Sequence, residues 1–212
     1  MPSAGLRLVW RPRSFAFAAA SAELIRRVVE DLGLAPRLAR VEIVVRPRPR
    51  GDDACIEWSG RGRLRVRLRL DAGNFLTAAG RRACAARRTG MSTLPPRRFS
   101  RRALAATLYH EFGHVADDVA LGIHAGGVET RRQPGFNEAW NVWIDGRLAR
   151  RGIPGVPRGE RWRHFLRAFP PPRHGTAGRP AECGHRREFA ALWGAAHLSR
   201  SALEAAARRL GA

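Results

Sequence analysis

The amino-acid sequence predicts an α+β fold in which a small N-terminal sheet, mixed or antiparallel, precedes a group of helices. Residues 1–70 hold four short apolar or alternating segments that are typical of strands. From residue 100 onward, apolar residues instead recur every three or four positions, as they do in helices. The chain has 212 residues, 44% of them hydrophobic, which is enough to bury one core. Strands first and helices after them are typical of the α+β class.

Strands are expected at residues 6–10, 40–46, 54–58 and 63–70. The last of these, RLRVRLRL, alternates with period two, so its apolar residues face a core while its arginines face outward. The outward arginine row has two interpretations. It is either the solvated face of a sheet, whose charges discourage pairing with another edge, or a wall that meets an anionic substrate.

Helices are expected at residues 14–32, 75–88, 100–121, 136–151 and 160–169, with one long helix or a pair of helices over 184–210. Asn137 is the expected cap of the helix over 136–151. Residues 170–182 are rich in Pro and Gly and are typical of a connector. We therefore expect one domain over residues 1–169. Residues 170–212 are expected to form a connector and a C-terminal helical segment that packs on the same domain.

The helix expected over residues 100–121 carries the pentapeptide His110-Glu111-Phe112-Gly113-His114. Ser100 is a suitable N-cap for this helix, and Gly122 is a suitable stop. Residues four apart lie on the same face of a helix, so the two histidines can offer their imidazoles to one metal ion. Glu111 would then lie beside the open position of the metal, where it can act as a general base.

This H-E-x-x-H motif resembles that of the zincin metallopeptidases, and the chain is most similar to a minimal, single-domain gluzincin. The resemblance implies a Zn²⁺ ion held by His110, His114 and a third protein ligand. It also implies hydrolysis of peptide bonds in a protein or peptide substrate by a metal-activated water, with Glu111 as the catalytic base. A small sheet ahead of the motif helix agrees with a zincin-like fold in a general way.

The third ligand of the gluzincins is a Glu on a following helix, often within an Asn-Glu-Ala sequence. Glu138, which lies 24 residues after His114 within Asn137-Glu138-Ala139, is therefore the first candidate. His124 is the second candidate, since a third histidine ten residues after His114 is similar to zincins of the SprT-like type. Asp145, on the same predicted helix as Glu138, is the third.

Several further side chains are candidates for supporting roles. Asp117 and Asp118 follow His114 by three and four residues, where a carboxylate could accept the second N–H of an imidazole. Asn141 or Asp145 could orient the ligands from the second helix. The residue that stabilises the oxyanion is left open by the sequence, with Tyr109, His164, His185 and the arginines as candidates.

The charge balance points to a second class of function. Lys and Arg together number 39 against 18 acidic residues, a formal net charge of +21, and every basic residue is an arginine. Such an excess favours acidic partners, nucleic acid among them. The alternative function is therefore a basic, nucleic-acid-associated protein, either a SprT-like protease that acts on DNA-bound proteins or a non-catalytic relic of the zincin site. A third possibility is a partner protein whose metal only stabilises the fold.

The cysteines and the apolar segments indicate the expected cellular location. The three cysteines, Cys55, Cys84 and Cys183, form no C-x-x-C pair, so neither a disulfide framework nor a cysteine zinc site is indicated. No apolar run reaches membrane-spanning length. The apolar stretch near the N-terminus continues a helical pattern after a predicted strand, and we interpret it as a native helix rather than a signal peptide. We expect a cytoplasmic protein with no membrane partner.

Overall fold

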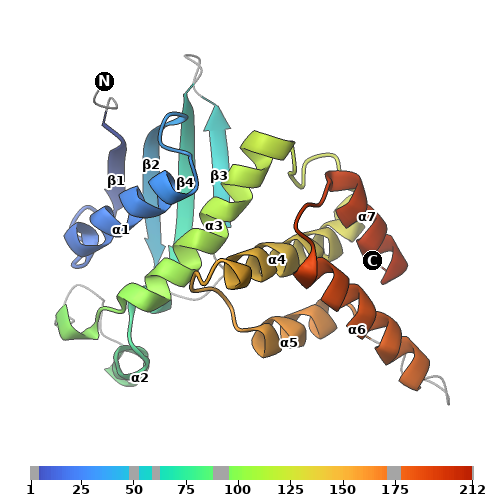
Figure 1. Cartoon of the computed structure of the whole chain (residues 1–212). Helices are drawn as coiled ribbons and strands as arrows, with labels where there is room; N and C mark the ends of the chain where they lie inside the picture. The colour runs from blue at the N-terminus through green and yellow to red at the C-terminus, as the bar shows by residue number, and fades with distance from the viewer. Residues whose placement is uncertain (1–4, 48–52, 59–62, 88–95, 171–177, 212) are drawn as a thin grey trace. The chain divides into compact units, whose positions relative to one another are not determined.

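The computed structural model describes residues 5–47, 53–58, 63–87, 96–170 and 178–211 (Figure 1). Its contacts group into two compact units, Met1–Ala116 and Asp117–Ala212, whose boundary falls inside helix α3 (Arg101–Leu121). The sequence predicted a different division, with one domain over residues 1–169 and a C-terminal segment over 170–212, and this stays a prediction. Within the described part of the chain there is no helix with both the length and the low polarity that crossing a bilayer requires.

The first unit is built on a four-stranded mixed sheet with the strand order β1-β2-β4-β3. β1 pairs with β2 and β2 with β4 in parallel, while β3 pairs with β4 in antiparallel fashion. The strands are β1 (Arg7–Arg11), β2 (Leu38–Arg46), β3 (Asp53–Trp58) and β4 (Leu64–Asp71). An α+β class with a small mixed sheet is thus confirmed, and each strand lies within two residues of its predicted position.

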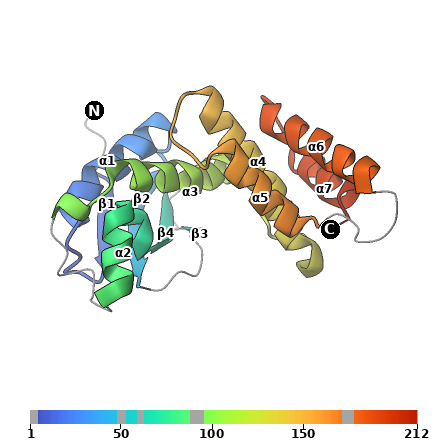
Figure 2. The same cartoon turned by 90° about the horizontal axis from the view of Figure 1, so that it is seen from below.

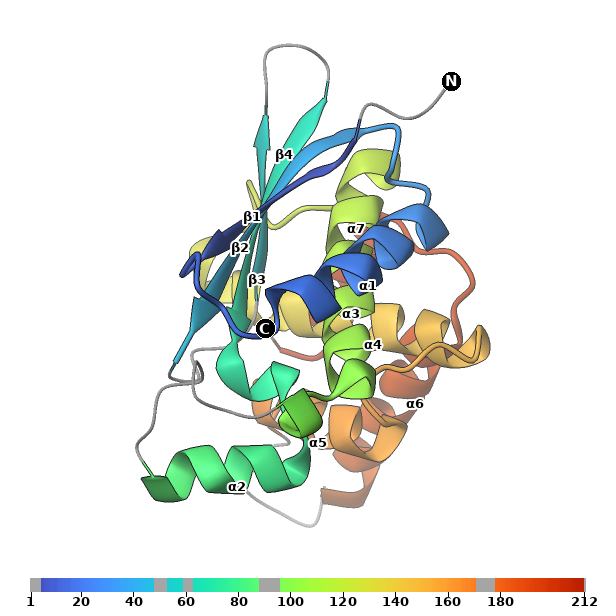
Figure 3. The ribbon, with the colours of Figure 1, turned by 90° about the vertical axis from the view of Figure 1, so that its left-hand side faces the viewer.

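One face of the sheet forms the core of this unit. Val41 pairs with Val66 and Ile43 with Leu68, and all four side chains are buried. Helices α1 (Ala18–Asp31) and α3 lie on one and the same face of the sheet, as Figures 2 and 3 show. The strict alternation of β4 follows from this arrangement, because successive side chains of a strand point to opposite faces and only one face meets apolar partners.

Helix α3 begins and ends where the sequence predicts. The backbone N–H of Ala103 donates to the Ser100 hydroxyl oxygen at 3.2 Å, which satisfies one of the free donors of the first turn. Gly122 has a φ of +64°, a conformation in which glycine is favoured, and the helix ends before it. Leu104, Leu108 and Phe112 are fully buried along one stripe.

Helix α1 starts four residues later than predicted. The chain ahead of it buries Phe15 and Phe17, and the Phe15 ring lies 5.4 Å from that of Trp10 and 4.8 Å from that of Phe75. This aromatic contact holds residues 14–17 in a turn rather than in a helix. The other helical segments of the first unit are α2 (Ala78–Arg87), η1 (Ala72–Phe75) and η3 (Pro96–Arg98).

The second unit is helical and is centred on α4. Helix α4 (Gln133–Arg150) packs against α5 (Arg158–Ala168), α6 (Gly178–Gly194) and α7 (Arg200–Arg209), with η4 (Thr130–Arg132) before it. The segment predicted over 184–210 is therefore a pair of helices. Helix α4 starts at Gln133, so the prediction that Asn137 caps it is wrong. Pro134 stands in the first turn, where its missing N–H leaves no hydrogen bond unmade.

A buried carboxylate organises the other face of the sheet. Glu42 of β2 is 6% exposed and accepts hydrogen bonds from the guanidiniums of Arg11 and Arg67, the latter at 3.3 Å. The hydrogen bond from Arg11 lowers the pKa of Glu42 below its ordinary value, against the opposing effect of burial, and Arg67 lowers it further. Glu42 is therefore ionised at neutral pH.

We expect Glu42→Gln to lower the free energy of unfolding at neutral pH, because the arginines lose a charged acceptor. A carboxylate with a depressed pKa stabilises the fold above its unfolded pKa of about 4.3, and this stabilisation is lost as the pH falls through the folded pKa. The gap between variant and wild type should therefore shrink toward pH 3, as measured by urea unfolding. Glu57→Gln, at a more exposed position on β3, is the control and should have the smaller effect.

A close approach of α4 and α6 requires a glycine. A Cβ added at Gly146 would lie 2.1 Å from the backbone oxygen of Trp193, so Gly146→Ala should separate the helices and cost about 1–3 kcal/mol. Gly159, exposed on α5 with nothing within 4 Å of an added Cβ, is the matched control. Gly159→Ala should raise stability by about 0.5–1 kcal/mol. Urea unfolding of both variants checks this, and equal changes would contradict it.

Candidate functional site

The two motif histidines lie in the first unit with their rings close together. The ring centres of His110 and His114 are 5.0 Å apart, with their planes at 78°. Two imidazoles that bind one tetrahedral Zn²⁺ at about 2.0–2.1 Å have ring centres about 5 Å apart. His110 and Glu111 are 9% and 7% exposed, and His114 is half-buried. The distance between the two rings is therefore compatible with a shared zinc ion.

The rotation of α3 about its axis sets the direction of these histidines. At about 100° per residue, His110 and His114 project about a third of a turn away from the buried stripe of Leu104 and Leu108. Tyr109 donates a hydrogen bond to the Asp31 carboxylate of α1, which ties the two helices together. A role of Tyr109 toward an oxyanion stays a prediction.

The structure leaves the choice of third ligand to the sequence prediction. The histidines belong to the first unit, whereas Glu138, His124 and Asp145 all belong to the second. Across the described residues, no three His, Cys, Asp or Glu side chains are grouped closely enough to hold a metal ion. Each candidate can still be compared by its surroundings within its own unit.

Glu138 and Asp145 share one buried arginine. Arg161 of α5 is 4% exposed and donates from Nε to Asp145 at 2.6 Å and from its Nη1 to Glu138 at 3.3 and 3.4 Å. Asp145 is 1% exposed and thus has a short, buried ion pair. Its role is to neutralise Arg161, which makes it a poor candidate for a metal ligand.

Glu138 has looser partners than Asp145. Its carboxylate is 9% exposed. From the described residues it receives only long hydrogen bonds, from Arg161 and, at 3.4 Å, from the side-chain amide of Asn141. A carboxylate has about four acceptor positions, so these contacts leave capacity for a further cation. Asn141 thus contacts Glu138; the prediction that Asn141 or Asp145 orients the ligands stays a prediction.

His124 is less suited to a metal. Its imidazole Nδ1 lies 3.3 Å from the Asp118 carboxylate, and its Nε2 lies 3.3 Å from a guanidinium nitrogen of Arg200. Both ring nitrogens thus have polar neighbours, and the positive charge of Arg200 disfavours a cation beside Nε2.

Asp117 has a partner set that the sequence did not indicate. Its two oxygens accept a bidentate pair of hydrogen bonds from Arg147 at 2.6 and 2.9 Å, and Trp140 Nε1 donates to it at 2.9 Å. Asp117 therefore anchors α4, and Asp118 pairs with His124. The predicted role of these carboxylates, to accept an imidazole N–H of the motif, stays a prediction.

The two other histidine candidates also lie in the second unit. Burial lowers the pKa of His164 on α5, and the charges of Arg161 and Arg167 lower it further, so His164 is neutral at pH 7. His185 of α6 is buried, with its ring 6.2 Å from that of Phe165. A stabilising role toward an oxyanion stays a prediction for both.

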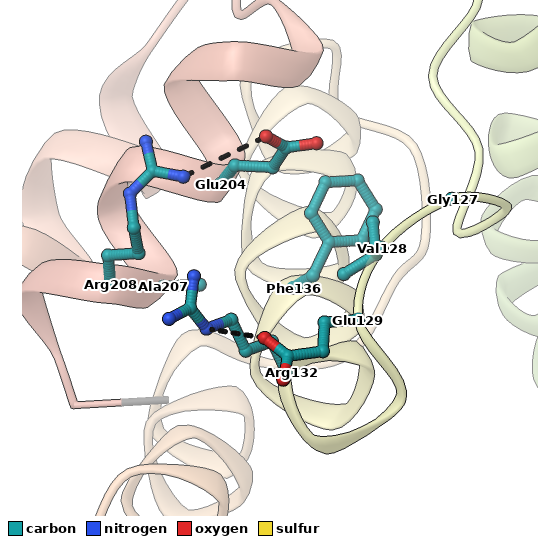
Figure 4. Close-up of a pocket in the computed structure, with 8 residues that line it drawn as sticks. All are labelled: Gly127, Val128, Glu129, Arg132, Phe136, Glu204, Ala207 and Arg208. Atoms are coloured by element: carbon teal, nitrogen blue, oxygen red, sulfur yellow. Dashed lines mark ion pairs between the residues drawn. The ribbon is translucent and has the colours of Figure 1, made fainter.

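A cavity of about 220 Å³ lies beside α7 in the second unit (Figure 4). Phe136 lines it, together with two ion pairs, Arg132 with Glu129 at 3.4 Å and Arg208 with Glu204 at 3.8 Å. Its charged side chains are already paired with one another. None of the predicted ligands lines it, so it is separate from the predicted metal site.

Comparison with known proteins adds no identification. No protein-family model matches the chain, and no curated protein or solved structure matches it. The resemblance to zincins stays a prediction that rests on the H-E-x-x-H motif in the sequence.

We expect Arg161→Met to destabilise the protein by about 3–5 kcal/mol at pH 7, because it leaves two buried carboxylates without their counter-ion. Urea unfolding at pH 7 is the measurement. The exposed Arg163, on the same helix, is the matched control, and Arg163→Met should stay within about 0.5 kcal/mol of wild type.

Proposed function

We propose that this protein is a zinc-dependent peptidase that hydrolyses peptide bonds in a protein or peptide substrate. One observation carries the proposal. His110 and His114 project from one helix with ring centres 5.0 Å apart, the separation that a shared tetrahedral ion requires, and Glu111 follows the first of them directly. The burial of His110 and Glu111 adds support, because electrostatic interactions strengthen where water is excluded.

Each of these side chains has a separate role in the proposed hydrolysis. Zinc, when bound, lowers the pKa of a coordinated water toward neutrality and polarises a carbonyl oxygen. His110 and His114 would hold the ion through their imidazole nitrogens. Glu111 accepts a proton at its carboxylate and later delivers it to the leaving amine, so that one group serves as base and then as acid.

Glu138 is our proposed third ligand. It is a carboxylate of a type that Zn²⁺ accepts, and its bonds to Arg161 and Asn141 are the weakest that a buried carboxylate of α4 makes. Asp145 holds Arg161 at the shorter distance, so Arg161 keeps a partner when Glu138 binds a cation. Arg161 and Asp145 would then orient Glu138, as hydrogen-bonded neighbours of metal ligands commonly do.

Other functions remain in the proposal as alternatives. A nucleic-acid-associated protein is favoured by the arginine-rich face of the sheet, described below. A metal that only stabilises the fold would need no catalytic Glu111.

We keep the cytoplasm as the expected location, because the cysteine pattern indicates no disulfide framework.

Elemental analysis of protein purified without chelators should find about one Zn²⁺ per wild-type chain. His110→Ala and Glu138→Gln should lose the metal. His124→Ala should keep it, and so should Asn137→Ala, an exposed neighbour of Glu138 that serves as the matched control. Loss of zinc in His124→Ala, with zinc kept in Glu138→Gln, would move the third ligand to His124.

Glu111→Gln separates catalysis from metal binding. The variant should keep its zinc, because Glu111 is not a ligand, and should hydrolyse an unfolded protein such as casein about 10²–10⁴ times more slowly. Wild-type turnover in this variant would falsify the mechanism. Zinc present with no hydrolysis by wild type on casein or on a mixed peptide library would favour a structural metal.

A further inference from the structure

The face of the sheet opposite α1 and α3 carries a concentration of arginines. Residues paired in register point to the same face of a sheet. The buried pairs Val41 with Val66 and Ile43 with Leu68 define the core face. The alternate positions form the other face. We call this the arginine face; its arginines are Arg7, Arg11, Arg40, Arg46, Arg65, Arg67 and Arg69. The carboxylates whose side chains the structure describes there are Glu42, Glu57 and Asp71.

Three of these arginines form one row across neighbouring strands. Arg7 of β1 pairs with Arg40 of β2, and Arg40 pairs with Arg65 of β4. Adjacent strands lie about 4.8 Å apart, so three positive charges stand side by side at the spacing of the sheet. Like charges directly opposite each other destabilise a sheet. Folding thus brings together charges whose repulsion an anion laid across the row would relieve.

The carboxylates on this face offset the row only in part. Glu57 of β3 lies opposite Arg65 in the strand register, but its ion pair is with Arg67. Glu42 shares its single charge among Arg11, Arg67 and, at 4.0 Å, Arg40. Arg67 also pairs with Glu57 at 3.0 Å. Within the described part of the chain, Arg7 and Arg65 are exposed and make no ion pair with any carboxylate.

We propose that the arginine face binds the phosphate backbone of a nucleic acid duplex. Arginine presents a planar fork that donates two parallel hydrogen bonds to a phosphate, and a row of forks at regular spacing suits a regular polyanion. The formal net charge of +21 adds long-range attraction to the same partner. This proposal does not depend on the metal site or on peptide hydrolysis.

The composition of the face further defines the contact. None of its described side chains is aromatic, so the face has no platform on which unpaired bases could stack. Its donors are guanidiniums, which position a protein on phosphates without reading sequence from base edges in a groove. We therefore expect sequence-independent binding to the backbone, with a strong dependence on salt.

The test is fluorescence anisotropy of a labelled duplex DNA with the full chain, over about 50–200 mM salt. Wild type should bind with a dissociation constant of about 100 µM or tighter. The row variant, Arg7→Gln/Arg40→Gln/Arg65→Gln, should bind about tenfold or more weakly at low salt. Its slope of log affinity against log salt should be smaller by about two to three, since each phosphate contact contributes about 0.9.

A charge-matched variant is the control. Arg26→Gln/Arg82→Gln/Arg102→Gln removes the same three charges from exposed positions on α1, α2 and α3 and should bind nearly as wild type does. Equal losses in the two variants would mean that net charge alone drives binding and would overturn the proposal. So would the absence of binding by wild type at low salt.

Two further measurements complete the design. Without nucleic acid, the row variant should be at least as stable as wild type, because it loses like-charge repulsion, and this separates lost binding from lost folding. Repeating the titration with duplex RNA shows whether the face prefers a DNA or an RNA duplex, since both have a phosphate backbone. Polyglutamate that competes as well as the duplex at equal charge would assign the face to acidic proteins and overturn the proposal.

Discussion

The burial of one stripe of α3 is the constraint on which the candidate site depends. Leu104, Leu108 and Phe112 leave almost no apolar surface in water, and this stripe determines how the helix is rotated. The rotation in turn places His110 and His114 together on another face of the helix. The Ser100 cap and the turn at Gly122 determine where the helix begins and ends. The placement of the two histidines is thus a consequence of ordinary hydrophobic packing and capping.

Each unit of this arginine-rich chain contains buried charges held in hydrogen-bonded groups. Glu42 in the sheet, Asp117 at the end of α3 and Arg161 on α5 are all less than 7% exposed, and each has two or more hydrogen bonds to partners. A buried charge with a missing partner is strongly unfavourable, so such groups fix which elements pack together. In the second unit, Asp117 holds α4 through Arg147 and Trp140, while Arg161 joins α5 to α4.

The two faces of the sheet show how one alternating pattern can serve two purposes. The apolar residues of β4 meet helices on one side, and the arginines between them meet solvent on the other. Judged from the sequence of β4 alone, these arginines are typical of a solvated strand whose charges discourage pairing with another edge. The register with β1 and β2 adds the aligned row of Arg7, Arg40 and Arg65, and it is this row that favours a polyanionic partner.

What the sequence determined by itself is local. Period-two alternation, period-four stripes, a serine cap and a glycine stop depend on neighbours within a few residues, and they located the strands, α3 and the spacing of the H-E-x-x-H histidines. Tertiary structure decided the rest. Arg161 could not be distinguished among the basic residues, because its partners lie 16 and 23 positions away and meet it only when α5 packs on α4. The sequence alone also did not predict the ion pair of Asp117 with Arg147, the early start of α4 or the arginine row. Each depends on which distant segments pack together, and that is set by register and helix packing rather than by any short stretch of chain.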